Sequence, residues 1–221
     1  EDVLPLSKGA KIALYGQGVK RTIKGGTGSG DVNEREDISI YDGMKDAGFV
    51  IVNEDWIDAY DKEYDQKRIE WRDGLLKEVN DPEGKKEKES FFELYAARPF
   101  PAPAGDEPEK EDTDTAFYVI SRTSGEAADR RNIRGDYYLT EEEEKFLDDL
   151  CRLYDKVIVI INTGGVLDLS FMDDHKNIYG LIFMCQAGME GGAALADIVS
   201  GKVSPGGHLT ATWCYDYEDY P

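Results

Sequence analysis

The chain has 221 residues, 40% of them hydrophobic and 11% aromatic, which is enough to build the core of one good-sized domain. Its formal net charge of −20 argues against nucleic acid and anionic membrane surfaces as partners, because both require a basic face. No segment approaches the length of a membrane span, and the N-terminal residues lack the basic and apolar regions of a signal peptide.

The cysteines and histidines show no pattern of a metal site or a disulfide framework. Cys151, Cys185 and Cys214 lack metal-ligand spacing, and their odd number fits a reducing compartment. His175 and His208 stand alone in the sequence, so a structural role is the simpler interpretation. We therefore expect no metal, no cofactor and a cytoplasmic bacterial protein rather than a secreted one.

Short apolar runs alternate with helical patterns along the chain, which is typical of a mostly parallel sheet between helices. The run from Val157 to Ile161 is apolar throughout, as in a strand buried on both faces. The prediction is an α/β sandwich with a six-stranded sheet. The expected strands are Lys11–Tyr15, Phe49–Val52, Ala116–Ile120, Val157–Ile161, Tyr179–Met184 and, with a weaker pattern, His208–Thr212.

Caps and apolar spacing mark the helices between these strands. Asn33 with Glu36 is interpreted as the N-cap pair of a helix that ends at Gly48. Thr140 and Glu143 form a capping box, and a last helix is expected from about Met189 to Ser200. A long helix that stops before Asp81 carries a stripe that we interpret as packing rather than a ligand platform, formed by Trp56, Tyr60, Tyr64, Trp71 and Leu75.

The segment from Asn80 to Thr115 differs in composition from the rest of the chain. It begins with a run of charged residues and then becomes rich in proline, a composition that adds no strand and little core. We interpret it as an insertion that wraps the surface, with a flap near the functional site as the alternative. The chain is therefore predicted to be one domain, 1–221, with a charged and proline-rich insertion at about 80–115.

Four glycine-rich polar loops follow predicted strands, at the edge where parallel α/β sheets bind ligands. Phosphate binding is disfavoured, because Lys24 precedes the glycines of its loop and Arg21 stands where a dinucleotide fingerprint needs glycine. A nucleophilic serine is also disfavoured, since neither histidine can be placed near Ser29 or Ser124. A ligand rich in hydroxyl groups suits the loops better. The four loops are residues 16–18 with 24–31, 121–131, 162–165 and 186–188.

One carboxylate, Glu126, stands in the loop after the third predicted strand, among Arg122, Arg130 and Arg131. A carboxylate on such a loop can donate and accept protons if its surroundings raise its pKa. Arginines paired with Glu126 would oppose that rise. We therefore expect them to point toward Asp129, Asp136 or a partner domain. An ordinary charged surface turn is the alternative that spacing alone leaves open.

Several of these motifs closely resemble the α/β-sandwich domain of glycoside hydrolase family 3. The resemblance covers nearly the whole chain except residues 80–115, and the motifs fall in the family's order. The last of them resembles the turn into the final strand of the domain, which we expect to be antiparallel. The matching segments are Arg21–Arg35, Ser121–Glu126, Gln186–Gly192 and Gly201–Leu209.

Most enzymes of this family are retaining β-glycosidases, most often β-glucosidases, which hydrolyse β-glucosides or oligosaccharides. The resemblance implies that Glu126 is the general acid/base and that Ser29, in a loop with Lys24, Thr27 and Gly28, reaches the bound sugar. The family's aspartate nucleophile lies on a barrel domain, for which this chain has no room. The barrel of the same enzyme is therefore the expected partner, and the chain alone is expected to be inactive. A non-catalytic module that binds carbohydrate or protein remains the alternative, and the oligomeric state stays open.

Overall fold

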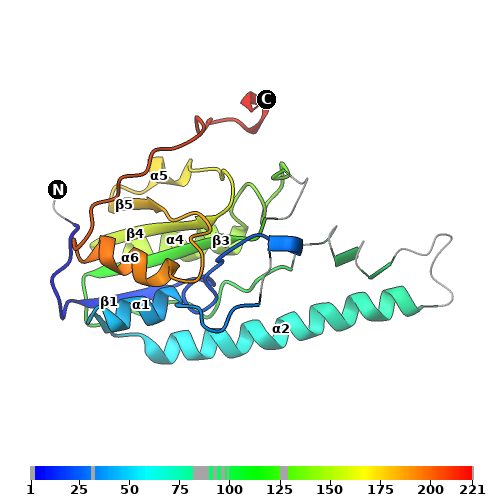
Figure 1. Cartoon of the computed structure of the whole chain (residues 1–221), viewed down its shortest axis with the longest axis horizontal. Coiled ribbons are helices and arrows are strands. Elements are labelled where there is room, and N and C mark those ends of the chain that lie inside the picture. Colours follow the sequence, from blue (N-terminus) through cyan, green and yellow to red (C-terminus); the bar gives the residue numbers. More distant parts are fainter. Residues whose placement is uncertain are drawn as a thin grey trace.

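The computed structural model describes residues 3–30, 33–81, 90, 91, 94, 95, 98, 100–124 and 129–220, without the side chain of Ser29. These residues form a five-stranded sheet in the order β2-β1-β3-β4-β5, in which all neighbours are parallel (Figure 1). The five expected strands and the α/β class are confirmed. The strands are β1 (Lys11–Tyr15), β2 (Val50–Ile51), β3 (Thr115–Arg122), β4 (Lys156–Thr163) and β5 (Ile178–Phe183).

The expected sixth, antiparallel strand at His208–Thr212 is not formed. The segment lies exposed without strand pairing, and Leu209 keeps 59% of its surface accessible. Leu209 is the single large apolar side chain between Gly206 and Thr212, so docking this segment on the edge of β5 would bury little apolar surface.

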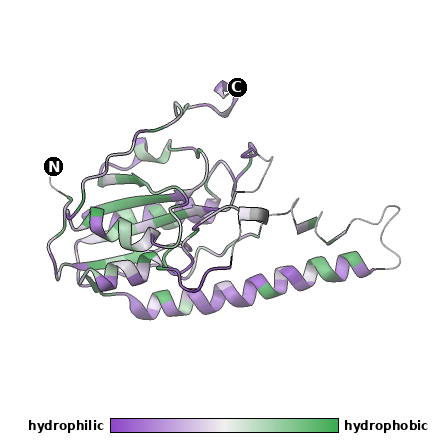
Figure 2. Ribbon diagram, viewed as in Figure 1, coloured by the Kyte–Doolittle hydropathy of each residue, from purple (hydrophilic) through white to green (hydrophobic). Residues whose placement is uncertain are grey.

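Alternate side chains of the central strands β1, β3 and β4 enter two cores, one on each face of the sheet. Phe117 and Val119 of β3 pack in the core beneath α1 (Ile40–Asp46) and α6 (Gly191–Val199). Tyr118 and Ile120 pack on the opposite face, against α4 (Glu141–Leu153). Figure 2 shows the hydrophobic strands within the compact part of the molecule, away from the far end of α2. Burial on both faces explains why these strands are apolar throughout.

The helix ends follow most of the expected signals. The capping box of Thr140 and Glu143 begins α4, as predicted. The prediction that Asn33 caps α1 is wrong, because Ser39 caps this helix by accepting from the Asp42 N–H. The backbone of Ile38 is instead paired with the loop before α6, so the chain cannot turn into a helix earlier. Gly48 ends α1 as expected, with a φ of +91° that glycine adopts without strain.

Helix α2 (Glu54–Asn80) ends where the sequence predicts. None of the described helices is long and apolar enough to cross a membrane. Described residues of the predicted insertion pack along α2 from Trp56 to Trp71. The indole of Trp56 donates to the Asp106 carbonyl at 3.0 Å, and the Tyr60 hydroxyl donates to the Pro103 carbonyl at 2.9 Å. Trp56 and Tyr60 stack at 5.2 Å. Trp56 and Tyr60 of this stripe thus serve packing, against residues 103 and 106 of the predicted insertion, and the surface-wrapping role of the insertion stays a prediction. Two short elements complete the chain, α5 (Phe171–Asp174) and the 3-10 turn η2 (Tyr217–Asp219).

Helices α1 and α6 touch through glycine backbone. A Cβ added at Gly43 would lie 2.2 Å from the Gly192 carbonyl oxygen, and one at Gly192 would lie 1.9 Å from the Ser39 carbonyl oxygen. Because the obstacle in both cases is backbone, neither helix can relax by rotating a side chain.

Gly43→Ala is therefore expected to lower the free energy of unfolding by about 1–3 kcal/mol, the usual cost of overpacking. Gly74→Ala is the matched control, because Gly74 lies in exposed helix α2 with open space around it. The control should raise stability by up to about 1 kcal/mol, since alanine is the better helix former. Urea denaturation measures both changes, and a Gly43→Ala protein as stable as the wild type would contradict the backbone contact.

Candidate functional site

The loops that follow β1, β3, β4 and β5 meet at one edge of the sheet, as the sequence predicts. The Gln17 amide donates to the Ser121 carbonyl at 2.5 Å, and the Gly188 N–H donates to the Lys24 carbonyl at 2.9 Å. Strand order reverses between β1 and β3, which is where ligands bind in open parallel sheets. We call this edge the rim.

The side chain of Asn162, at the end of β4, is fully buried and joins three of the rim loops. Its Oδ1 accepts from the Ile23 N–H at 2.7 Å and from the Ser121 hydroxyl at 3.3 Å. Its Nδ2 donates to the carbonyls of Ile23 and Cys185, both at 2.8 Å. Cys185 has a φ of +58°, which is uncommon for a residue other than glycine, and this contact fixes its carbonyl. Asn162 is therefore a structural residue of the rim rather than a ligand-binding one.

The loop after β1 lies in close contact with the end of β3. A Cβ at Gly16 would lie 2.2 Å from the Val119 carbonyl oxygen, and one at Gly18 would lie 2.2 Å from the Ser121 hydroxyl. The small residues of this loop thus serve close backbone packing. The polar groups that a ligand could reach lie farther out, around Thr27 and Ser124.

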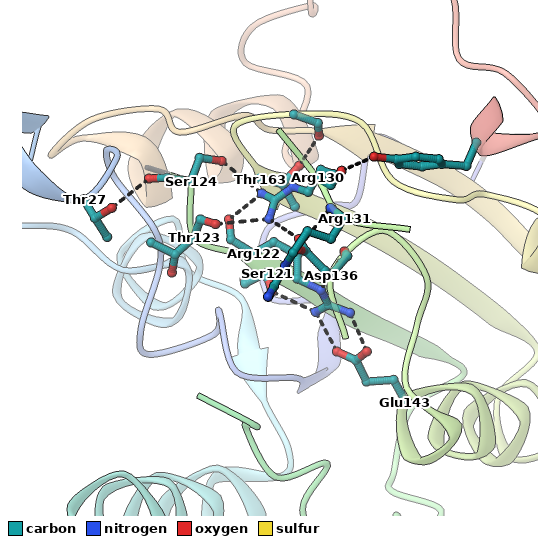
Figure 3. Close-up of polar contacts among 12 residues, drawn as sticks. Thr27, Ser121, Arg122, Thr123, Ser124, Arg130, Arg131, Asp136, Glu143 and Thr163 are labelled. Carbon is teal, nitrogen blue, oxygen red and sulfur yellow. Dashed lines mark hydrogen bonds and ion pairs between the residues drawn. The ribbon is translucent and has the colours of Figure 1, made fainter. Parts of the chain in front are cut away.

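Ser124 is the last described residue before Glu126 and is fixed from two directions (Figure 3). Its carbonyl accepts from the Thr27 N–H at 2.8 Å and from the Thr27 hydroxyl at 3.3 Å. Its hydroxyl accepts from Nη2 of Arg130 at 2.9 Å. The loop that follows β1 therefore contacts the loop that follows β3 at Ser124, which precedes Glu126 closely in the sequence.

Arg130 bonds the end of the loop after β3 to the start of that loop. Its guanidinium donates to the carbonyls of Thr123 at 3.1 Å and Arg122 at 3.3 Å, besides the Ser124 hydroxyl. The side chain is 11% exposed and forms a 3.0 Å ion pair with Asp136. Burial lowers the pKa of Arg130, while the Asp136 carboxylate opposes that change. Residues 122–124 are thus bonded to residue 130 across the intervening loop.

Each arginine of this cluster meets a described carboxylate. Arg131 also donates to Asp136, at 2.9 Å, so Asp136 accepts from two arginines. Asp136 was one of the expected partners of these arginines. Burial alone would raise the pKa of Asp136, but hydrogen bonds from Arg131 and Arg130 outweigh burial and hold the pKa below its ordinary value. Arg122 makes a bidentate pair with Glu143, at 2.8 and 2.5 Å, which the sequence had not predicted. Glu143, the glutamate of the α4 capping box, is thus also the partner of Arg122 (Figure 3).

The predicted site residues are described to different extents. Glu126 lies outside the described residues, and of Ser29 only the backbone is described, in the 3-10 turn η1 (Gly28–Gly30). Thr27 is exposed and Gly28 has open space around its Cα, with a φ of +75°. Lys24 forms an ion pair with Glu34, whose side chain is 11% exposed. Among the described residues, no group of histidine, cysteine and acidic side chains could hold a metal ion.

Asp136→Asn removes the negative charge from a cluster of two arginines. It should lower the free energy of unfolding at pH 7 by about 1–3 kcal/mol, the range for hydrogen bonds to charged groups. The folded-state pKa is depressed, so this contribution is complete above the unfolded pKa of about 4 and disappears as pH falls through the folded value.

Urea denaturation from pH 7 to pH 3 should therefore show a constant gap between wild type and variant above about pH 5, which narrows below about pH 4. Asp129→Asn, an exposed neighbour in the same loop, should produce little gap at any pH. A wild type–Asp136→Asn gap that stays constant down to pH 3 would contradict the assignment.

Comparison with known proteins identifies the family. Residues 1–221 match the model of the glycosyl hydrolase family 3 C-terminal domain. The chain is 34% identical to β-glucosidase A of Butyrivibrio fibrisolvens, over 100% of the chain and 27% of that protein. It is 32% identical to a β-glucosidase of Ruminococcus albus, over 99% of the chain and 22% of that protein. The chain thus spans about a quarter of these relatives.

Solved structures agree with this assignment. β-Glucosidase 3B from Thermotoga neapolitana in complex with glucose is similar at a TM-score of 0.76 and 34% identity, over 99% of this chain and 29% of that one. A β-glucosidase from Paenibacillus barengoltzii is similar at a TM-score of 0.72 and 29% identity, over 99% of this chain and 22% of that one. The chain belongs to the C-terminal domain family of glycoside hydrolase family 3.

Proposed function

We propose that this chain is the acid/base domain of a retaining β-glycosidase that acts on β-glucosides, with Glu126 as its general acid/base. The names of the relatives, which are β-glucosidases, support the substrate class. The observation that carries the proposal is the pair of fixed ends around Glu126. Ser124 is bonded to Thr27 on one side and to Arg130 on the other, so the backbone enters and leaves the Glu126 segment at defined positions.

The charges around this loop suit an acid that must be neutral when it acts. Arg122 is paired with Glu143, and Arg130 and Arg131 are paired with Asp136. These carboxylates offset the positive charge that would otherwise lower the pKa of a neighbouring carboxyl group. The proposal requires Glu126 to be protonated when the substrate binds.

The proposed reaction has two steps. An aspartate on a barrel domain of the same polypeptide attacks the anomeric carbon, while Glu126 gives its proton to the leaving oxygen. The bond to the leaving group breaks and a glycosyl–enzyme bond forms. Glu126, now ionised, takes a proton from water, the water oxygen attacks the anomeric carbon, and the aspartate leaves with net retention. Ser29 contacts the sugar in this proposal, from the loop that Lys24, Thr27 and Gly28 help to shape.

In the full-length enzyme, Glu126→Gln should lower kcat/KM by about 10²–10⁴-fold on an alkyl β-glucoside, whose leaving group needs a proton. The loss should be far smaller on a dinitrophenyl β-glucoside, whose leaving group departs as an anion. Glu142→Gln, on the exposed first turn of α4, is the matched control and should change neither value. Equal losses on both substrates would contradict the acid role. No loss on either would favour a non-catalytic binding module.

A further inference from the structure

The segment 213–220, drawn in red in Figure 1, has a pattern that specifies an inner and an outer face. Cys214, Tyr217 and Tyr220 are half-buried, whereas Tyr215 is 84% exposed. Cys214, Tyr217 and Tyr220 stand three residues apart, which matches the period of the 3-10 turn η2 and places Tyr217 and Tyr220 on one face. The side chain of Asp216 caps this turn by accepting from the Glu218 N–H at 3.0 Å. The segment is therefore built to lie against a surface.

That surface is the end of the loop after β3. The ring of Tyr137, which is fully buried, meets the ring of Tyr217 edge-on at 5.0 Å and the ring of Tyr220 edge-on at 6.0 Å. Edge-to-face aromatic contacts of this kind each contribute about 0.5–1.5 kcal/mol beyond the area they bury. At the start of the segment, Trp213 packs edge-on against Phe183 of β5 at 5.1 Å. The segment thus joins the end of β5 to the loop after β3.

Hydrogen bonds fix the register of this contact. The Tyr217 hydroxyl donates to the carbonyl of Arg130. The Asn132 amide donates to the Glu218 carboxylate at 3.1 Å, and the Tyr137 hydroxyl donates to the Cys214 carbonyl at 3.4 Å. Three separate residues of the loop are therefore bonded to the segment.

Arg130 is consequently fixed from both sides. Its guanidinium bonds inward to the end of β3, while its carbonyl accepts from Tyr217 on the outside. We propose that the segment 213–220 is a clamp on the loop after β3 and that Tyr217 is a positioning residue for the acid/base. This inference rests on the proposed function, because the clamped loop is the one that carries Glu126. Tyr217 acts through Arg130 and needs no contact with substrate.

A purely structural role for Tyr217 makes a different prediction from a positioning role. Loss of general stability would reduce the amount of folded enzyme and lower activity equally on all substrates. Misplacement of the acid would lower activity only where the leaving group needs a proton, because proton transfer depends on the distance and angle of the donor.

The test uses the full-length enzyme with Tyr217→Phe, which removes one hydroxyl and keeps the ring. Tyr215→Phe, in the same segment and 84% exposed, is the matched control. We expect kcat/KM of Tyr217→Phe to fall roughly tenfold on an alkyl β-glucoside and to stay nearly unchanged on a dinitrophenyl β-glucoside. Tyr215→Phe should match the wild type on both. Equal loss on both substrates, or no loss on either, would overturn the proposal.

Two further measurements separate this proposal from the proposed function. If Glu126→Gln discriminates between the two substrates and Tyr217→Phe does not, the clamp is wrong and the acid role stands. If Glu126→Gln does not discriminate, the acid role is wrong, and amide hydrogen exchange then decides on the clamp. Faster exchange of residues 129–132 in Tyr217→Phe than in Tyr215→Phe supports the clamp, and equal exchange overturns it.

Discussion

The buried carboxamide of Asn162 is the constraint on which the rim depends. β4 lies between β3 and β5, so a side chain at its end can reach both neighbours, and the loop from β1 crosses over β3 to meet the same amide. Leaving one of these buried partners unsatisfied would cost about 1–3 kcal/mol. The three loops therefore cannot move apart independently, and the polar groups of the rim are presented on a rigid base.

A second constraint is electrostatic. In a chain with a net charge of −20, the arginines around the loop after β3 are unusual in their density, and the described carboxylates nearby are used to pair with them. Arg122 and Glu143 tie the end of β3 to the start of α4, whereas Asp136 holds the two later arginines. The ion pairs of this loop thus leave each of its described arginines next to a carboxylate.

Local patterns predicted much of this molecule. The five strands, the capping box of α4 and the end of α1 at Gly48 follow from apolar runs and cap residues close in sequence. Arg130 and Arg131 pair with Asp136, which is one of the three destinations that the sequence left open, beside Asp129 and a partner domain. Each of these features depends on residues that lie close together in the sequence.

The features that were missed depend on distant contacts. Asn33 and Glu36 have the sequence of a cap, but pairing of Ile38 with the loop before α6 delays the helix. Asn162 looked like a polar loop residue, because its burial arises from contacts with Ile23, Ser121 and Cys185, which lie 139, 41 and 23 residues away in the sequence. The inner face of residues 213–220 has a three-residue spacing that becomes visible once η2 is known, and the exposed 208–212 segment lacks the apolar residues of a paired strand.

The central claim is that this domain carries one half of a catalytic pair. Hydrolysis of an aryl β-glucoside by the purified 221-residue chain tests it most directly, with circular dichroism to verify that the chain is folded. The account predicts no hydrolysis above the buffer rate, because the proposed mechanism takes its nucleophile from another domain. Hydrolysis by the isolated chain that Glu126→Gln abolishes would contradict it.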